Sequence, residues 1–365
     1  MGLFKIVLVF VLFAPVCHTL QQSLKLNELK NDLLNLLDVK EKPAITRTRW
    51  QVPRFVIDLY RQQAFKDGYT KDDSPGKTIR TFFREPKDKR GPHKHLFTFN
   101  ITTIKRSEKI GHASLRIFKR RSRMAKPSGH FKITVYRLAI PWRKDNRRWK
   151  KKLVYLDSKL VKCRKEGEWI DFNVTSAVKY WTNYKSKNYG LWLSVRGYRV
   201  PSSDFNVATG GRKDPFLVEF GVDRKKLQKA REIKEESGAK NKLEEVALVE
   251  ATKARSRRSM SDLCKRHRLF VKFHDLNWDD WIIAPRGFSA FYCMGTCPEV
   301  IEKYFNPTNH AIIQNLIHHR RSKAVPAACC VPTKLHSITM LYFELDGSIV
   351  MKEYGEMVAS SCGCR

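Results

Sequence analysis

The cysteines near the carboxyl end limit most strongly what this 365-residue chain can fold into, because seven of its nine lie in the last 107 residues. A segment of that length buries a small hydrophobic core, so covalent cross-links commonly supply its stability. This crowding predicts a disulfide-stabilised domain formed in an oxidising compartment. The seven are Cys264, Cys293, Cys297, Cys329, Cys330, Cys362 and Cys364.

Sequence alone does not fix how these cysteines pair, because six of them already allow many connectivities. If the CxGxC segment 293–297 paired with the CxC segment 362–364, two bridges would close a small ring. Its glycines would carry no side chain to block that ring, and a bridge from Cys264 could thread it to Cys330. Cys329 would then be left over, and an odd cysteine in a secreted chain indicates an intermolecular bond.

A metal site is the alternative use of these cysteines, since six histidines share the segment. The spacings CxxxC, CC and CxC differ from the paired CxxC knuckles of zinc domains, and an oxidising compartment favours disulfides. We therefore expect no metal and no cofactor. The chain also carries no glycine-rich phosphate loop, HExxH or GxSxG motif, so we expect no enzyme activity.

The first 19 residues have the three parts of a secretory signal: Lys5, the apolar run 6–13, and small residues before a cleavage site near Thr19. A buried amino-terminal strand is the alternative, disfavoured because no turn precedes the run. Two sequons that begin at Asn100 and Asn173 fit glycosylation on a secretory route. The expected location is therefore extracellular.

A processing site divides the chain at Arg255-Ser-Arg257-Arg258, immediately before Ser259. Each of these arginines can make bidentate contacts in an acidic protease pocket, whereas the alternative is a solvated charge run. The run Arg120–Arg123 is a weaker second candidate. The expected parts are a signal peptide 1–19, a propeptide 20–258 (helical strap about 24–65, β-rich arm about 75–222, linker 223–258) and a mature part 259–365.

The formal net charge of +35 belongs almost entirely to the first 258 residues, which carry +33, whereas the last 107 carry +2. Scattered basic runs in the first part indicate solvated faces or contacts to acidic matrix polysaccharide such as heparan sulfate. A polyanion-binding matrix protein is therefore one alternative function. A nucleic-acid partner conflicts with the secretory signal, so none is expected.

Periodicity predicts several elements along the chain. In the propeptide, a leucine stripe ends before Pro43 and a second helix covers 52–65, while strand-like runs lie at 96–101, 131–138 and 191–195. In the mature part we expect a strand at 269–273, a helix over 308–317 that begins after a proline, and a hairpin. The hairpin strands 337–344 and 348–358 flank Asp346-Gly347, a turn dipeptide.

The cysteine pattern C…CxGxC…CC…CxC, ending at Arg365, resembles the cystine knot of the transforming growth factor β superfamily. The sequence between the cysteines is similar to the bone morphogenetic protein/decapentaplegic branch. The segment 169–181 is similar to a segment typical of family propeptides. The supporting segments are DLNWDDWIIAP, AFYC, NHAIIQ, CCVPTKL and YGEMV. The resemblance implies a small disulfide-rich β fold with two hairpin fingers and one helix, preceded by an α+β propeptide.

The resemblance also implies the pairs Cys264–Cys330, Cys293–Cys362 and Cys297–Cys364. Cys329 would bond its copy in a second chain, giving a disulfide-linked homodimer or a heterodimer. Such a ligand would assemble type I and type II receptor serine/threonine kinases, and its own propeptide would assist folding and shield it.

Receptor contacts carry over by resemblance onto two surfaces. Exposed tryptophans would act as anchors in a concave type I site completed by the partner chain, although the same two could be core residues. The type I set is Trp278, Trp281, Asn309, Ile312, Ile313 and Leu316. The type II set, on a convex exposed strand face, is Ala284, Pro285, Thr339, Met340, Leu341 and Met351.

One loop departs from the resemblance. After Cys297-Pro298 the run 299–303 is Glu-Val-Ile-Glu-Lys, where relatives carry an aromatic residue and another proline. Because this loop contributes to type I receptor choice in the family, a ligand-like antagonist that occupies receptors without assembling them stays an alternative.

Overall fold

The computed structural model describes residues 31–32, 34–35, 39, 41–43, 51–71, 77–85, 95–123, 129–142, 147–223, 228, 262–321 and 325–365. Expectations for the signal segment, the linker and the cleavage site at Arg255, Arg257, Arg258 and Ser259 lie outside these residues. The same holds for the leucine stripe at Leu26, Leu29, Leu33, Leu36 and Leu37. Within the described ranges, none of the helices has the length and apolarity that a membrane span requires.

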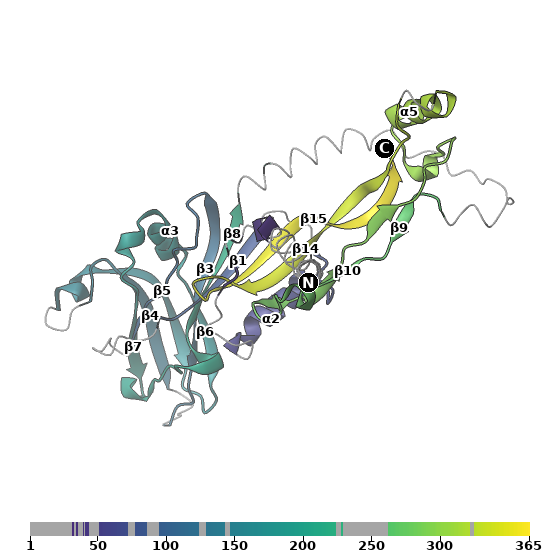
Figure 1. Cartoon of the computed structure of the whole chain (residues 1–365). Helices are drawn as coiled ribbons and strands as arrows, with labels where there is room; N and C mark the ends of the chain where they lie inside the picture. Colours follow the sequence, from purple (N-terminus) through teal and green to yellow (C-terminus); the bar gives the residue numbers. More distant parts are fainter. Residues whose placement is uncertain are drawn as a thin grey trace, which may run out of the picture.

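A β-rich arm forms one end of the molecule, and a long hairpin leads from it to a helix at the other end (Figure 1). One arm sheet has the order β2–β7–β4–β5, and all its neighbours are antiparallel. Its strands are β2 (Leu96–Phe97), β4 (His130–Leu138), β5 (Leu153–Lys162) and β7 (Leu191–Tyr198). The predicted strands 131–138 and 191–195 lie within β4 and β7, whereas of the predicted strand 96–101 only the first two residues form β2.

A second sheet runs through both halves of the chain, with the order β11–β14–β15–β1–β8–β3–β6. The propeptide region supplies β1 (Lys77–Phe83), β3 (Glu108–Lys119), β6 (Glu168–Asn173) and β8 (Phe216–Asp223). The carboxyl-terminal region supplies β11 (Ile282–Ala284), β14 (Cys330–Phe343) and β15 (Ile349–Cys364). The junction is β1, which pairs with β8 on one edge and with 349–352 of β15 on the other.

The arm core lies between its two sheets, where alternate strand residues point inward. Phe131 and Ile133 of β4, Leu115 of β3 and Phe172 of β6 are fully buried there. Helix α3 (Thr175–Asn183) packs on β3 and adds Trp181, which is also fully buried. This single apolar cluster fixes which face of each arm strand looks outward.

The carboxyl-terminal region is built on the β14–β15 hairpin. Its turn closes through the Glu344 amide, which donates to the Ser348 carbonyl, and Gly347 has φ of 75°. That positive φ explains why glycine follows Asp346 at this turn. The remaining strands are short: β9 (Lys265–His267), β10 (Phe270–Lys272), β12 (Gly287–Ser289) and β13 (Tyr292–Met294). They pair as β9 with β13 and β10 with β12.

Two helices outside the arm matter for the site. Helix α2 (Arg54–Gln63) follows Pro53, and its Val56 and Tyr60 are buried. Helix α5 (Asn309–Arg320) is capped by Thr308, whose hydroxyl accepts from the Ala311 amide at 3.1 Å. Short 3₁₀ turns complete the fold at Arg147–Lys152, Lys185–Lys187, Ser202–Asp204, Gly211–Lys213, His274–Leu276 and Lys303–Phe305.

A buried ionic cluster lies where the arm meets the hairpin. The Arg80 guanidinium on β1 makes a bidentate contact with Glu108 of β3 and lies 3.7 Å from Glu219 of β8. All three side chains are nearly inaccessible. Burial raises the pKa of Glu219 to about 7, against the lowering effect of Arg80, and burial also raises the pKa of Glu344 at the hairpin turn.

The raised pKa of Glu219 predicts that the arm loses stability as pH rises. Its carboxyl binds a proton more tightly in the folded chain than in the unfolded one, so its contribution is complete below about pH 4.5 and lost through about pH 7. We expect the free energy of unfolding to fall by roughly 2 kcal/mol from this group between pH 5 and pH 8. Denaturant titrations of the full chain check this, and Glu219→Gln should flatten the profile. If the dependence of the free energy of unfolding on pH were unchanged in that variant, groups other than Glu219 would be its cause.

Candidate functional site

Three disulfides tie the hairpin base to the short strands. They join Cys264 to Cys330, Cys293 to Cys362 and Cys297 to Cys364, with Cα–Cα distances of 5.4, 5.6 and 5.9 Å. These distances are ordinary for protein disulfides. The pairs are the ones that the family resemblance implies. We call these six residues the disulfide cluster.

Two glycines make room inside the disulfide cluster. Gly295 has φ of 125°, and a Cβ there would lie 2.4 Å from the Leu263 carbonyl oxygen. A Cβ on Gly363 would lie 2.4 Å from the Phe305 carbonyl oxygen. Backbone therefore passes directly against both short segments: the Cys264 amide donates to the Thr296 carbonyl, and the Thr296 amide donates to the Asp262 carbonyl. The CxGxC and CxC spacings follow from this close packing.

The metal alternative fails on the chemistry of the sulfur atoms. Cys264, Cys297 and Cys364 bring three sulfurs within 4.8 Å of one another, the one such group among the described residues. Each of these sulfurs is part of a disulfide, so none is available as the thiolate that zinc binds.

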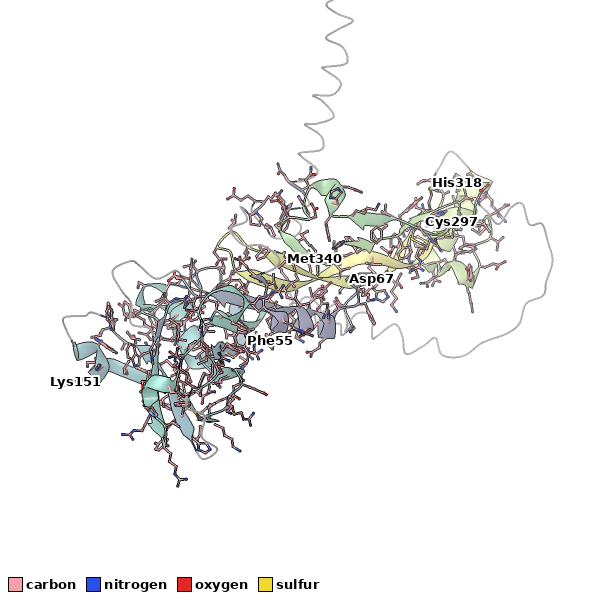
Figure 2. All side chains as sticks on the ribbon, turned by 90° about the horizontal axis from the view of Figure 1, so that it is seen from below. Phe55, Asp67, Lys151, Cys297, His318 and Met340 are labelled. Atoms are coloured by element: carbon pink, nitrogen blue, oxygen red, sulfur yellow. A yellow bond between two sulfur atoms is a disulfide. The ribbon has the colours of Figure 1, made fainter. Side chains whose placement is uncertain are left out.

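Helix α5 lies at the same end of the molecule as the disulfide cluster, as the labels of His318 in α5 and of Cys297 show (Figure 2). Ala311 and Asn315 face the disulfide cluster and are fully buried, and the Asn315 amide donates to the Pro298 and Glu299 carbonyls. The opposite side of α5 is apolar yet open to solvent: Ile312, Ile313, Leu316 and Ile317 are 41–57% exposed. Cys329 is an exposed thiol beside this region of the chain.

Trp278 and Trp281 differ from the expected exposed anchors, because both are buried in this chain. Their rings meet edge to face with centroids 5.4 Å apart, and Trp281 packs in the same way on Tyr342. They belong to a cluster with Phe273, with Phe288 of β12 and with residues of the β14–β15 hairpin such as Tyr342. The expectation that both tryptophan side chains are exposed is therefore not met in this chain. Both are core residues here, as the alternative proposed.

The cover over this tryptophan cluster comes from the propeptide region. Leu34 and Val39 are buried within it, although they precede the tryptophans by more than 200 residues. Lys42 lies 2.7 Å from the Asp280 carboxylate and also donates to the Asn277 carbonyl. Because that ion pair is partly exposed to solvent, the burial of apolar side chains contributes most of the stabilisation of this contact.

The strand face expected to bind type II receptors is also covered. Thr339, Leu341 and Met351 are nearly inaccessible, Pro285 is buried and Ala284 is half-buried. Helix α2 covers this face with Val56 and Tyr60. We call these five carboxyl-terminal residues the outer finger face.

Met340 was grouped with this face and does not belong to it. Side chains of successive strand residues point to opposite sides, so Met340 points away from Leu341. It lies in the cluster of Trp281 and Tyr342 instead. The sequence grouping was wrong because it took three consecutive strand residues as one surface.

A short propeptide segment binds the outer finger face through its backbone. The Thr339 amide donates to the Gly68 carbonyl at 2.8 Å, and the Thr70 amide donates to the Ser337 carbonyl at 3.3 Å. The Thr70 and Thr339 hydroxyls lie 2.9 Å apart. Gly68 has φ of 86°, and a Cβ there would lie 2.7 Å from Cγ of Pro285. The segment 68–70 therefore fits closely only with glycine at 68.

We expect Gly68→Ala to open this contact, because alanine would be strained at that φ and would overlap Pro285. Amide hydrogen exchange on the full chain should show the Thr339 amide exchanging about tenfold faster or more, corresponding to about 1.4 kcal/mol. Gly355→Ala is the matched control, since nothing lies within 4 Å of a Cβ at that position. Equal exchange in both variants would contradict the assigned fit.

Two other sequence candidates lie in the arm. Asn100 and Asn173 are exposed, and each side-chain oxygen accepts from the amide and hydroxyl of the threonine two residues later. In the run Arg120–Arg123 the three arginine side chains are exposed, but the backbone is held by hydrogen bonds. Ser122 is buried, and the amides of Arg120, Ser122 and Arg123 all donate to other parts of the chain. A protease needs such a backbone extended and unpaired, so this run is protected in the folded arm.

Sequence comparisons match the two halves of the chain separately. Residues 14–220 match the description TGF-beta propeptide, and residues 263–364 match the description transforming growth factor beta like domain. The chain belongs to the transforming growth factor β family, whose members are growth-factor ligands and not enzymes.

Particular relatives place it near the decapentaplegic branch. Protein decapentaplegic of Drosophila melanogaster is 32% identical over 372 residues, covering 93% of this chain and 62% of the relative. Protein DVR-1 homolog of Strongylocentrotus purpuratus is 34% identical over 288 residues, covering 74% and 61%. The chain thus spans about three fifths of the length of these relatives.

Proposed function

We propose that this chain is the precursor of a secreted signalling ligand of the bone morphogenetic protein type. Its carboxyl-terminal part, released after Arg258, is a cystine-knot growth factor that acts as a disulfide-linked dimer. The signal peptide 1–19 and propeptide 20–258 are removed on the secretory route. The ligand assembles type I and type II receptor serine/threonine kinases, and phosphorylation belongs to those receptors.

One observation carries this proposal: an exposed cysteine outside the three disulfides lies at the same end as an apolar helix face. A folded monomer rarely leaves four large aliphatic side chains of one helix open to solvent. A two-fold partner would cover Ile312, Ile313 and Leu316 and bring two copies of Cys329 together. In this dimer Asn309 and the helix face complete the tryptophan site of the opposite chain.

The propeptide has a second role in this proposal, because it covers both receptor surfaces. Leu34 and Val39 pack over the tryptophan cluster, and α2 with segment 68–70 packs over the outer finger face. Receptors bind only after these contacts are released. Two copies of each surface then recruit receptors at one place on the membrane, which raises their effective concentration.

A receptor-dependent transcription assay on medium from cells that express the full chain tests the proposal. We expect a response from the wild type and a large loss with Arg255→Ala/Arg258→Ala, which blocks release of the ligand. The matched control is Arg120→Ala/Arg123→Ala in the protected arm run, which should leave the response intact. A product that raises no response but suppresses that of a known ligand would identify an antagonist instead.

A further inference from the structure

The outer side of the arm sheet β2–β7–β4–β5 carries an exposed basic surface that the growth-factor function does not use. Phe131 and Ile133 point into the arm core, so the alternate residues of β4 point outward. Register then places Arg196 and Leu160 on either side of Lys132. The next row places Tyr198 and Lys162 on either side of His130. Lys132, Lys162, Arg196 and Tyr198 are exposed, and we call these four residues the outer arm face.

The outer side of this sheet contains a shallow cavity. Five side chains of three strands line a cavity of about 480 Å³: His130, Lys132, Ser158, Leu160 and Tyr198. The Ser158 hydroxyl, which accepts from the Thr134 hydroxyl at 3.3 Å, and the Tyr198 hydroxyl line the hollow beside the Lys132 ammonium. Adjacent strands lie about 4.8 Å apart and alternate residues about 6.7 Å apart, which puts the Cα atoms of the three cations within roughly 12 Å of one another.

Within the described strands of this sheet, no carboxylate lies beside these cations on the outer side. Asp157 is the one acidic residue in the described strands of this sheet. Its carboxylate accepts from the Asn173 amide of β6, on the other sheet, and from the Ser158 amide. Lys132 and Arg196 stand directly opposite each other, an arrangement that disfavours the sheet by like-charge repulsion. A bound polyanion would remove that cost.

We propose that the outer arm face binds a sulfated polysaccharide of the extracellular matrix. Sulfate groups would contact Lys132, Lys162 and Arg196, with the arginine fork able to bind two oxygens of one sulfate. The Tyr198 ring, 42% exposed at the rim, offers a flat apolar surface for a sugar ring. The proposal rests on the proposed function only for the extracellular location of the chain.

Other polyanions fit this face less well. A nucleic acid needs several aromatic rings on which successive bases stack, and one tyrosine lines the hollow. A membrane surface would favour protruding apolar groups beside the cations, whereas Leu160 is the single large aliphatic residue of the hollow. Figure 1 shows β4, β5 and β7 at the end of the molecule opposite α5, so a polysaccharide here would leave the proposed dimer surface open.

Binding of the full chain to a size-defined heparin oligosaccharide tests the proposal. The face variant is Lys132→Gln/Lys162→Gln/Arg196→Gln. The matched control removes three exposed lysines elsewhere, as Lys109→Gln/Lys179→Gln/Lys272→Gln. We expect the face variant to bind about tenfold more weakly at physiological salt, with a salt dependence shallower by about two to three charges, and the control to change less than twofold. Tyr198→Ser should weaken binding without changing the salt dependence, because it removes ring contact and no charge.

Thermal unfolding of each variant shows whether the arm stays folded, and we expect both triple variants to unfold at or above the wild-type temperature. Equal heparin affinity in the face and control variants would overturn the proposal. Equal binding of desulfated heparin, single-stranded DNA or phosphatidylserine vesicles would also overturn the assignment to a sulfated polysaccharide. None of these readouts depends on dimerisation or receptor signalling, so failure here is separate from failure of the proposed function.

Discussion

Loss of one bridge of the disulfide cluster is expected to unfold the carboxyl-terminal domain at physiological temperature. Replacing both Cys293 and Cys362 by serine removes a bridge between residues 69 positions apart. Such a bridge contributes about 2–4 kcal/mol, mainly by restricting the unfolded chain. For a domain of this size the midpoint of thermal unfolding should fall by about 10 °C or more. Calorimetry on the purified full chain and the yield in the medium measure the effect.

Cys163→Ala is the control for that experiment. Cys163 is buried in the arm, where its Sγ lies 3.9 Å from Asp204, and it takes part in none of the three disulfides. Its replacement should cost about 1 kcal/mol or less and leave the carboxyl-terminal transition in place. Equal losses in the two variants would mean that the disulfide cluster does not carry the stability assigned to it.

Removal of the Arg80 guanidinium is expected to break the junction between arm and hairpin. Arg80→Met leaves the Glu108 and Glu219 carboxylates buried without their cation, which typically costs about 3–5 kcal/mol. Arg80 lowers the pKa of Glu219, so without the cation this carboxyl would bind its proton more readily, and the loss should be larger at pH 7.5 than at pH 5. Denaturant unfolding at the two pH values measures it.

Two further variants separate charge from packing at this junction. Arg84→Met removes a guanidinium that pairs with Asp214 directly after β1, where both side chains are more accessible than those of Arg80 and its partners, and it should cost less than Arg80→Met. Adding Glu108→Gln and Glu219→Leu to Arg80→Met should recover most of the stability, because neither of the two carboxylates beside Arg80 is then left without its cation. A loss that is the same at both pH values would contradict the electrostatic origin.

Local sequence signals predicted most elements, whereas the disulfide pairs were implied by the family resemblance. The apolar spacing of 52–65 predicts α2, and Asp346-Gly347 predicts the hairpin turn, because both depend on residues a few positions apart. The helix start after Pro307 also follows from capping chemistry at Thr308. The cysteine spacing indicates the clustered bridges, because glycine between cysteines leaves space for neighbouring backbone.

Partners far apart in the sequence could not be predicted in this way. Nothing local in 77–83 says that it adds to the edge of β15 rather than to another strand. Likewise Trp278 and Trp281 carry no signal that Leu34 and Val39 cover them. For Met340 a local signal was available, because side chains alternate along a strand. Applying this rule would have placed Met340 on the side of the tryptophan cluster, opposite Thr339 and Leu341.

The central claim is that two carboxyl-terminal domains are joined through Cys329 while the other six cysteines stay within one chain. Peptide mapping of the released fragment under non-reducing conditions tests it directly, with a non-reducing gel of the same sample. The account predicts a reducible dimer and a Cys329–Cys329 peptide, alongside the three bridges of the disulfide cluster. A monomeric fragment with Cys329 as a thiol, or with Cys329 bonded within its own chain, would contradict it.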